Sequence, residues 1–272
     1  MIRIRSILYK ISFGIFLLFI PSIGFSQLTM GARALGLGQA TSALPNYEWA
    51  LFSNPALANN EQLSIGFYGL RNYGFAELTD MSAFGSIPTN FGVGSVGFHR
   101  YGDNLFNETR IKIGYKNGWR NLHFGAAFNY NHISFGADYG AGGAIGIDAG
   151  IAAEITPELW IGARTTNVNQ PKYSGIDEDL ARELAIGFSY NLNELALFTM
   201  DVVKDVQFAV SYRGGLQVKV IEDLKGRIGI TTAPVTYAFG LGYGKALWEV
   251  NFAMQKHSYL GFSPGLDLLF FF

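Results

Sequence analysis

Residues 122–131 read LHFGAAFNYN and residues 145–155 read IGIDAGIAAEI, and each stretch alternates between two kinds of side chain. In the first stretch, Phe124 and Phe128 fall on one face, whereas Gly125 falls on the other. A period of two is that of a β-strand, whose successive side chains point to opposite faces. The second face carries small and polar residues rather than Lys and Glu, which is typical of a closed all-β barrel with lipid outside and a crowded lumen inside.

The same alternation continues after residue 61 and predicts an antiparallel transmembrane β-barrel of fourteen strands. Such an even number lets both ends of the chain lie on the periplasmic side of the membrane. All the longer connections fall at one end of the barrel, as expected for outer loops; they are residues 101–107, 134–142, 167–181 and 256–262. We expect the strands at residues 62–70, 75–87, 91–101, 108–117, 121–133, 143–155, 159–166, 182–191, 194–203, 207–220, 225–232, 235–243, 247–256 and 263–272.

The composition excludes several classes of protein. Only 15 % of the 272 residues are charged, 20 Lys and Arg nearly balance 21 Asp and Glu, and 15 % are aromatic. Soluble domains carry about 25 % charged residues, disordered chains are poorer in aromatic residues, and nucleic-acid binders are usually basic. Because the chain has no Cys, it has no disulfide, thiolate metal site or thiol nucleophile. We therefore expect no nucleic-acid partner and an outer surface that largely contacts outer-membrane lipid.

Residues 1–26 have the three parts of a secretory signal peptide. Arg3, Arg5 and Lys10 make the start positive, residues 11–20 are apolar, and small residues precede the predicted cut after Ser26. The apolar run is too short to cross a bilayer core of about 30 Å, and a retained anchor helix is the alternative. We expect export to the outer membrane of a Gram-negative bacterium, with both termini in the periplasm.

Residues 27–61 lack the alternation and form a separate region. The run GARALGLGQA at residues 31–40 has the glycine content of a phosphate-binding loop, but no strand precedes it and no Lys–Ser/Thr pair follows it. Asn54-Pro55 marks a turn that leads into a helical start. We expect a compact hatch or plug in the lumen, with residues 62–272 forming the barrel. Its expected ligand-facing residues are Trp49, Leu51, Phe52, Asn54, Pro55 and Ala56.

Two motifs in this region resemble the N-terminal signature of the FadL superfamily of outer-membrane barrels. They are GARALGLG at residues 31–38 and the later turn Asn54-Pro55-Ala56. Within that superfamily the chain looks most similar to the PorV/PorQ-like proteins of Bacteroidota, which the stretch DVVKD at residues 201–205 and Tyr212-Arg213 also resemble. The resemblance implies a fourteen-stranded barrel, a hatch built around the Asn54 turn, and an outer-membrane location.

The resemblance also implies one of two functions. FadL-type members pass hydrophobic compounds across the outer membrane, whereas PorV-like members are accessory barrels of the type IX secretion pathway. We expect transport of small hydrophobic compounds, and the alternative is a non-transporting accessory barrel of a type IX secretion or surface-assembly complex. The expected partner is accordingly either a hydrophobic small molecule or a secretion or surface-assembly protein.

Ionisable residues at lumen-facing positions form a second candidate site. A charge on the lipid face would cost about 2–4 kcal/mol at mid-membrane, which favours the inward assignment. These residues either line a polar path or form ion pairs that fill the lumen and hold the hatch. They are Arg110, Lys112, Asp148, Glu154, Arg164, Arg213, Arg227, Glu249 and Asp267.

The sequence gives little support for catalysis. His132 and Ser134 share one strand face, so that His132 is a candidate base for a serine nucleophile. Both residues are expected to face lipid, however, and no third residue is placed to orient the histidine. No cluster of His, Asp and Glu has the spacing of metal ligands. We expect that the protein is not an enzyme and that it holds neither a metal nor a cofactor.

Overall fold

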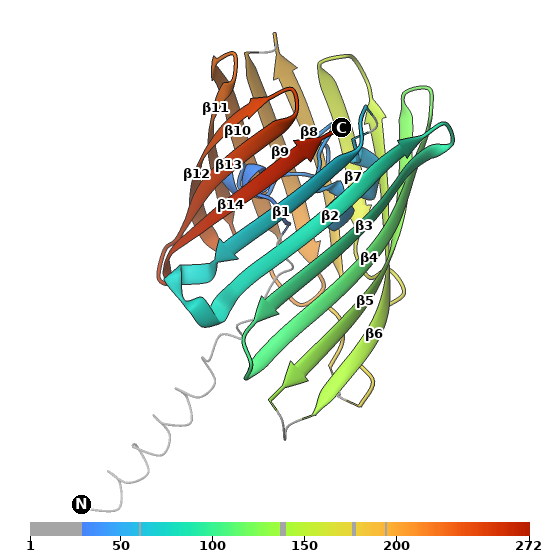
Figure 1. Cartoon of the computed structure of the whole chain (residues 1–272), viewed down its shortest axis with the longest axis vertical. Helices are drawn as coiled ribbons and strands as arrows, with labels where there is room; N and C mark the ends of the chain where they lie inside the picture. Colours follow the sequence, from blue (N-terminus) through green and yellow to red (C-terminus); the bar gives the residue numbers. More distant parts are fainter. Residues whose placement is uncertain (1–28, 60, 137–139, 176–177, 194) are drawn as a thin grey trace, which may run out of the picture.

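Fourteen antiparallel strands close into a barrel that holds the N-terminal part of the described chain inside it (Figure 1). The computed structural model describes residues 29–59, 61–136, 140–175, 178–193 and 195–272. The barrel closes because β1 pairs with β2 on one side and with β14 on the other. The predicted all-β barrel of fourteen strands is confirmed, whereas the predicted signal peptide lies outside the described residues.

The observed strands follow the predicted ones within a few residues. The largest differences are at the starts of β2 and β10. Residues 72–78 form two 3-10 turns: η3 (Asn72–Gly74), in which Tyr73 and Gly74 have φ angles of 55° and 80° that a strand does not accommodate, and η4 (Ala76–Leu78), which occupies the predicted start of β2. The strands are β1 Ser64–Arg71, β2 Thr79–Thr89, β3 Gly92–Gly102, β4 Phe106–Trp119, β5 Leu122–Phe135, β6 Ala141–Glu154, β7 Leu159–Thr165, β8 Glu183–Leu192, β9 Ala196–Asp205, β10 Ser211–Ile221, β11 Leu224–Thr232, β12 Val235–Lys245, β13 Trp248–His257 and β14 Gly261–Phe271.

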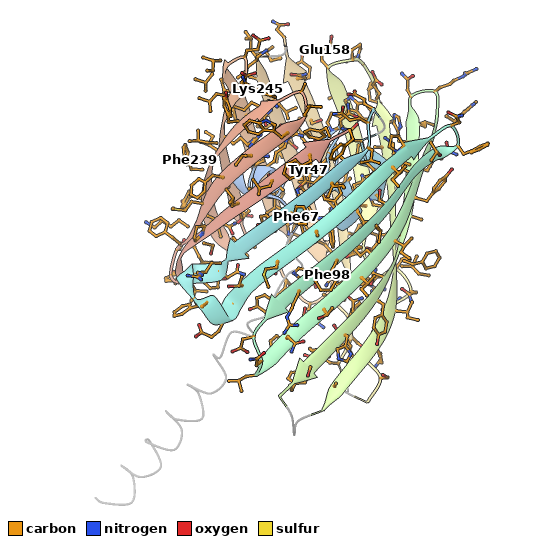
Figure 2. All side chains as sticks on the ribbon, in the orientation of Figure 1. Tyr47, Phe67, Phe98, Glu158, Phe239 and Lys245 are labelled. Carbon is orange, nitrogen blue, oxygen red and sulfur yellow. The ribbon has the colours of Figure 1, made fainter. Side chains whose placement is uncertain are left out.

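Apolar side chains point outward around the barrel. Phe67, Phe98 and Phe239, on three different strands, project away from the wall and are 51 %, 44 % and 50 % exposed (Figure 2). On β14, Leu268 faces outward while its neighbour Asp267 is buried inside. An exposed apolar surface of this extent is what a lipid bilayer covers. Among the described residues, no helix is long and apolar enough to cross a membrane.

The two ends of the barrel differ in their connections. The end that carries the C-terminus has only short connections, at residues 90–91, 120–121, 155–158, 193–195, 222–223 and 246–247 (Figure 1). The opposite end has the longer ones, at residues 72–78 and 166–182, although residues 233–234 are also a short turn there. Of the connections predicted to be long, 167–181 is long, but the strands extend into 101–107 and 256–262 and leave only residues 103–105 and 258–260 as connections; the long connection 72–78 was not predicted. The orientation of the two ends relative to the periplasm stays a prediction.

Residues 29–59, which we call the lumen segment, lie inside the barrel (Figure 1). The segment contains the helix α2 (Ala32–Gly36) and two 3-10 turns, η1 (Ala50–Phe52) and η2 (Pro55–Leu57). Asn54 caps η2, because its side chain accepts a hydrogen bond from the backbone N–H of Ala56, while Pro55 needs no such partner. The centre of the barrel is thus a packed core rather than an open channel.

Candidate functional site

The six residues predicted to face a ligand all lie in the interior of the barrel. Trp49, Asn54 and Ala56 are fully buried, and Leu51, Phe52 and Pro55 are buried as well. The Trp49 ring packs edge-on against Phe84, with 4.7 Å between the ring centroids. These residues contact the barrel wall, so that a ligand would reach them only if part of the lumen segment moved.

Glycines on the inner face of the wall allow the lumen segment to approach the strands closely. A Cβ atom added at Gly125 would overlap the backbone of Pro55, and one added at Gly162 would overlap the backbone carbonyl of Ser42. A Cβ atom at Gly215 would lie 2.5 Å from the carbonyl oxygen of Leu37. We call this set the lumen glycines; they are Gly97, Gly114, Gly125, Gly150, Gly162, Gly215, Gly229 and Gly240, and each comes from a different strand.

Two buried carboxylates hold the backbone of the lumen segment. Oδ2 of Asp201 on β9 accepts hydrogen bonds from the backbone N–H of Thr41 at 2.9 Å and of Ser42 at 3.0 Å, and from the Ser42 hydroxyl at 2.7 Å. Oδ2 of Asp267 on β14 accepts one from the backbone N–H of Ala32 at 2.7 Å. A buried backbone N–H that lost such a partner would stay unsatisfied, at a cost of about 1–3 kcal/mol, so these two aspartates fix the segment at two points.

Three further side chains bind carbonyl groups of the lumen segment. Ser189 donates to Ala43 at 2.6 Å, Thr199 donates to Ala40 at 3.0 Å, and Lys116 donates to Ala58 at 2.6 Å. In the described part of the chain, the segment's backbone-to-backbone hydrogen bonds stay within the segment. It is therefore attached by separate side-chain contacts and by packing, and it could move without breaking the strand pairing of the wall.

Most of the nine lumen ionisable residues lie in ion-pair clusters. In the first cluster, Lys112 is 2.5 Å from Asp148, and both are buried. In the second, Glu183 contacts Arg164 at 2.5 Å and Arg213 at 3.2 Å. Buried charges are tolerated when they are paired in this way, and removal of one partner typically costs about 3–5 kcal/mol.

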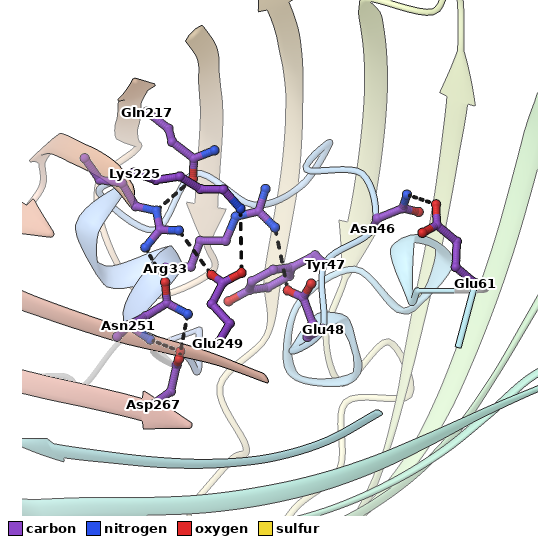
Figure 3. Close-up of polar contacts among 12 residues, drawn as sticks. Arg33, Asn46, Tyr47, Glu48, Glu61, Gln217, Lys225, Glu249, Asn251 and Asp267 are labelled. Atoms are coloured by element: carbon purple, nitrogen blue, oxygen red, sulfur yellow. Dashed lines mark hydrogen bonds and ion pairs between the residues drawn. The ribbon is translucent and has the colours of Figure 1, made fainter. Parts of the chain in front are cut away.

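The third cluster lies beside the start of the lumen segment (Figure 3). Arg227 contacts Gln217 at 2.7 Å, Asn251 at 2.5 Å and Glu249 at 3.4 Å. Asn251 in turn donates to Oδ1 of Asp267 at 2.8 Å. These contacts run across strands β10–β14 of the wall and end at Asp267, whose carboxylate binds the backbone of the lumen segment.

Three ionisable residues of the lumen segment lie next to this third cluster (Figure 3). Burial raises the pKa of the Glu48 carboxyl, whereas the nearby guanidinium of Arg33, 3.6 Å away, lowers it. Burial also raises the pKa of Tyr47 well above its usual range, and its hydroxyl donates to the carbonyl of Met30. The segment thus places its own ion pair inside the barrel.

Two of the nine residues lie apart from these clusters. Arg110 is only partly buried and donates to Asn131 at 2.5 Å, and Glu154 is partly exposed at the end of β6. Glu183 and Asp201 are also buried in the lumen, although they were not predicted there. The same alternation would have identified both, since Leu184 and Val202 next to them face outward.

The strand pairing of the wall is interrupted at β7. This short strand pairs with β6 only between residues 149 and 154, so residues 141–148 of β6 extend beyond it. The connection 166–182 occupies that place: the backbone N–H of Val168 donates to Ile147, and the side chain of Asn169 bonds Ile145 at 2.8 Å and Ile147 at 2.9 Å. An open groove of about 540 Å³ lies here, lined in part by Tyr130 and Lys172.

His, Asp and Glu side chains are the candidate metal ligands of the described residues. No group of three or more His, Asp or Glu side chains in that part of the chain could hold a metal ion. His132 lines the outer groove next to Tyr130, as the alternation predicted for a lipid-facing position. What the lumen offers is a packed segment, paired charges and a few apolar contacts.

Comparisons with known proteins support the fold. No protein-family model and no curated protein matches the chain. Among solved structures, the chain is similar to the toluene transporter TodX of Pseudomonas putida, with a TM-score of 0.69 and 13 % identity over 91 % of this chain and 99 % of that one. A FadL homologue of Pseudomonas aeruginosa has a TM-score of 0.58 and 12 % identity over 91 % and 99 % of the two chains. The monoaromatic hydrocarbon channel CymD has a TM-score of 0.65 and 12 % identity over 92 % and 99 %. The fold is therefore that of FadL-type barrels.

Proposed function

We propose that this protein is an outer-membrane barrel that passes small hydrophobic compounds, with the lumen segment as its hatch. The observation that carries the proposal is the attachment of that segment. It fills the lumen, yet it is held by separate side-chain hydrogen bonds and by close packing, and not by strand pairing. A barrier of this kind opens when a limited set of contacts breaks, while the wall stays intact.

The apolar outer surface supports the membrane location. Its side chains lie on all sides of the barrel, and their removal from water would stabilise the inserted state by about 25 cal/mol per Å² of apolar area. The long connections would lie outside the cell, and both termini would lie in the periplasm after removal of residues 1–26.

The break in pairing at β7 supports a lateral route through the wall. Residues 141–148 of β6 face the connection 166–182 instead of a strand, and an open groove borders this place. A connection joined to β6 by scattered hydrogen bonds separates from it more easily than a paired strand does. A hydrophobic compound that passed here would move between the lumen and the lipid without crossing water.

The proposed substrate class rests on the similar structures. TodX is a toluene transporter, and CymD is a monoaromatic hydrocarbon channel. For the present chain we propose compounds of that size, because the lumen segment packs closely against the wall, as Pro55 does at Gly125 and Trp49 does against Phe84.

A second candidate function is an accessory barrel of a type IX secretion or surface-assembly complex, as in PorV/PorQ-like proteins of Bacteroidota. The close fit between the lumen glycines and the segment favours it, since a scaffold would keep its lumen closed. On this proposal the connection 166–182 would contact the partner protein.

One pair of measurements separates the two functions. Uptake of radiolabelled ethylbenzene is measured in Gram-negative cells that produce the full chain. The control cells produce a general porin in its place. The protein is also purified from its native membranes under mild conditions. Transport predicts faster uptake with the full chain and no stoichiometric protein partner. Uptake equal to the control, together with a stoichiometric partner, contradicts transport and supports the accessory barrel.

A further inference from the structure

We infer that the lumen contains a site for one neutral hydroxyl group of a hydrophobic ligand, formed by Tyr68, Ser82 and His99. The inference rests on the proposed function, because it names a polar feature of the compound that passes. The three residues lie on the adjacent strands β1, β2 and β3, and all three face the lumen. Tyr68 is paired in register with Ser82, and Ser82 with His99, so neighbouring Cβ atoms are about 4.5–5.5 Å apart.

Each of the three side chains is buried and has a polar atom without a partner. Their exposed fractions are 5 % for Tyr68, 5 % for Ser82 and 4 % for His99. The atoms without a hydrogen bond are the Tyr68 hydroxyl, the Ser82 hydroxyl and Nδ1 of His99. Leaving such a group unsatisfied costs about 1–3 kcal/mol. We call Tyr68, Ser82 and His99 the row, and three unsatisfied groups on neighbouring strands indicate a partner that is bound in another state.

Asp80 determines which hydrogen-bonding role His99 can take. Oδ1 of Asp80 is 2.7 Å from Nε2 of His99, and Oδ2 accepts a hydrogen bond from Asn72 at 2.6 Å. With Nε2 donating to the carboxylate, a neutral imidazole presents Nδ1 as an acceptor. The row therefore offers one acceptor, at His99, and two hydroxyl donors, at Tyr68 and Ser82.

A neutral hydroxyl group matches this set. It can donate its proton in a hydrogen bond to Nδ1 of His99 and accept one from the hydroxyl of Tyr68 or Ser82. A plain hydrocarbon can do neither, and a carboxylate has no proton to donate to Nδ1. A phenol or an alcohol is thus the ligand class that satisfies the row.

Apolar side chains border the row and would contact the rest of the ligand. Trp49 packs against Tyr68 with 5.8 Å between the ring centroids, and against Phe84 with 4.7 Å. The indole N–H of Trp49 is also without a partner. Because the row is closed to solvent here, a bound ring would take the place of part of Trp49, between the wall and the lumen segment.

The test compares ethylbenzene with 4-ethylphenol, which differ by one hydroxyl group, as ligands of the purified full chain in detergent. We expect calorimetric titration to show that 4-ethylphenol binds about tenfold more tightly, which is the effect of one to two net hydrogen bonds. Tyr68→Phe should remove most of this preference by weakening the binding of 4-ethylphenol. It should leave the melting temperature unchanged or higher, because an unsatisfied buried hydroxyl is lost. Tyr212→Phe, on the outer face, is the matched control and should change neither quantity.

Several results would overturn the inference. The first is an equal affinity for the two compounds, and the second is no binding of either compound. The third is that Tyr68→Phe keeps the preference for 4-ethylphenol. Each of these results would mean that Tyr68, Ser82 and His99 bind water only. Ser82→Ala gives the same comparison if Tyr68→Phe does not fold. Because the readout is binding, ethylbenzene uptake by cells would still test the proposed transport function on its own.

Discussion

At the scale of single residues, Asp201 carries the largest share of the polar contacts that position the lumen segment. One carboxylate oxygen accepts three hydrogen bonds from Thr41 and Ser42, and Asp201 itself is fully buried. Asp201→Ala would leave two backbone N–H groups without a partner, and we expect it to destabilise the protein by about 2–4 kcal/mol. Hydrogen exchange at Thr41 and Ser42 should become at least about tenfold faster.

Hydrogen-exchange mass spectrometry and urea unfolding in detergent check this prediction. Glu222→Ala, in the exposed connection 222–223, removes an acidic side chain without touching the lumen segment and serves as the control. Unchanged exchange at Thr41 and Ser42 in Asp201→Ala would show that packing alone holds the segment.

The side of the wall on which a residue lies could be predicted, but its partners could not. Alternation placed Arg227 and Glu249 in the lumen. Their contact depends on the register of β11, β12 and β13, because they lie two strands apart. A period of two gives the face of the sheet, whereas the height of a residue along the barrel comes from the pairing of strands, which single-chain patterns leave open.

At the scale of elements, the lumen glycines set how closely the segment approaches the wall. A methyl group at Gly125 would overlap Pro55, whereas one at Gly94 on β3 would meet no atom within 4 Å. We expect Gly125→Ala to lower the free energy of unfolding by about 1–3 kcal/mol through overpacking, and to displace the turn at Asn54. Gly94→Ala, the matched control, should have no such effect. Urea unfolding and exchange at residues 54–57 measure both, and equal behaviour of the two variants would contradict the role of the glycines.

The connection 166–182 provides a second test among the elements. Asn169→Ala removes the two side-chain hydrogen bonds of Asn169 to β6, whereas the backbone hydrogen bond from Val168 to Ile147 stays. We expect exchange in residues 166–175 to become faster and ethylbenzene uptake to rise, because the lateral route opens more often. Glu178→Ala, an exposed change in the same connection, is the control. Slower or unchanged uptake alongside faster exchange would exclude this place as the route.

The elements themselves were largely predictable, because long alternating stretches determine them. The start of β2 was predicted too early, since residues 76–78 form the 3-10 turn η4, which alternation does not report. The packing of the connection 166–182 was also not predicted. Its Tyr173 and Leu180 are buried against Ile133 and Ala144, a contact between parts of the chain that no local pattern links.

At the scale of the whole molecule, the apolar outer surface should be needed for insertion. Phe239→Lys places a charge on the outward face in the middle of β12, and we expect it to reduce the folding free energy in lipid vesicles by about 2–4 kcal/mol. Leu247→Lys, in the short connection 246–247, should cost less than half of this, because its site lies at the end of the barrel. Equal costs would contradict a bilayer around the middle of the barrel.

The central claim is that the lumen segment moves to let a hydrophobic compound pass. A Cβ atom at Gly114 would lie 2.5 Å from Cδ1 of Leu51, and the chain has no Cys of its own. The double variant Leu51→Cys, Gly114→Cys can therefore form only this disulfide, which would lock the segment to β4.

Leu51→Cys alone controls for the lost side chain. We predict that ethylbenzene uptake by cells falls to background when the pair is oxidised and recovers on reduction. Uptake that stays at the level of the single variant, with the disulfide fully formed, would contradict the account.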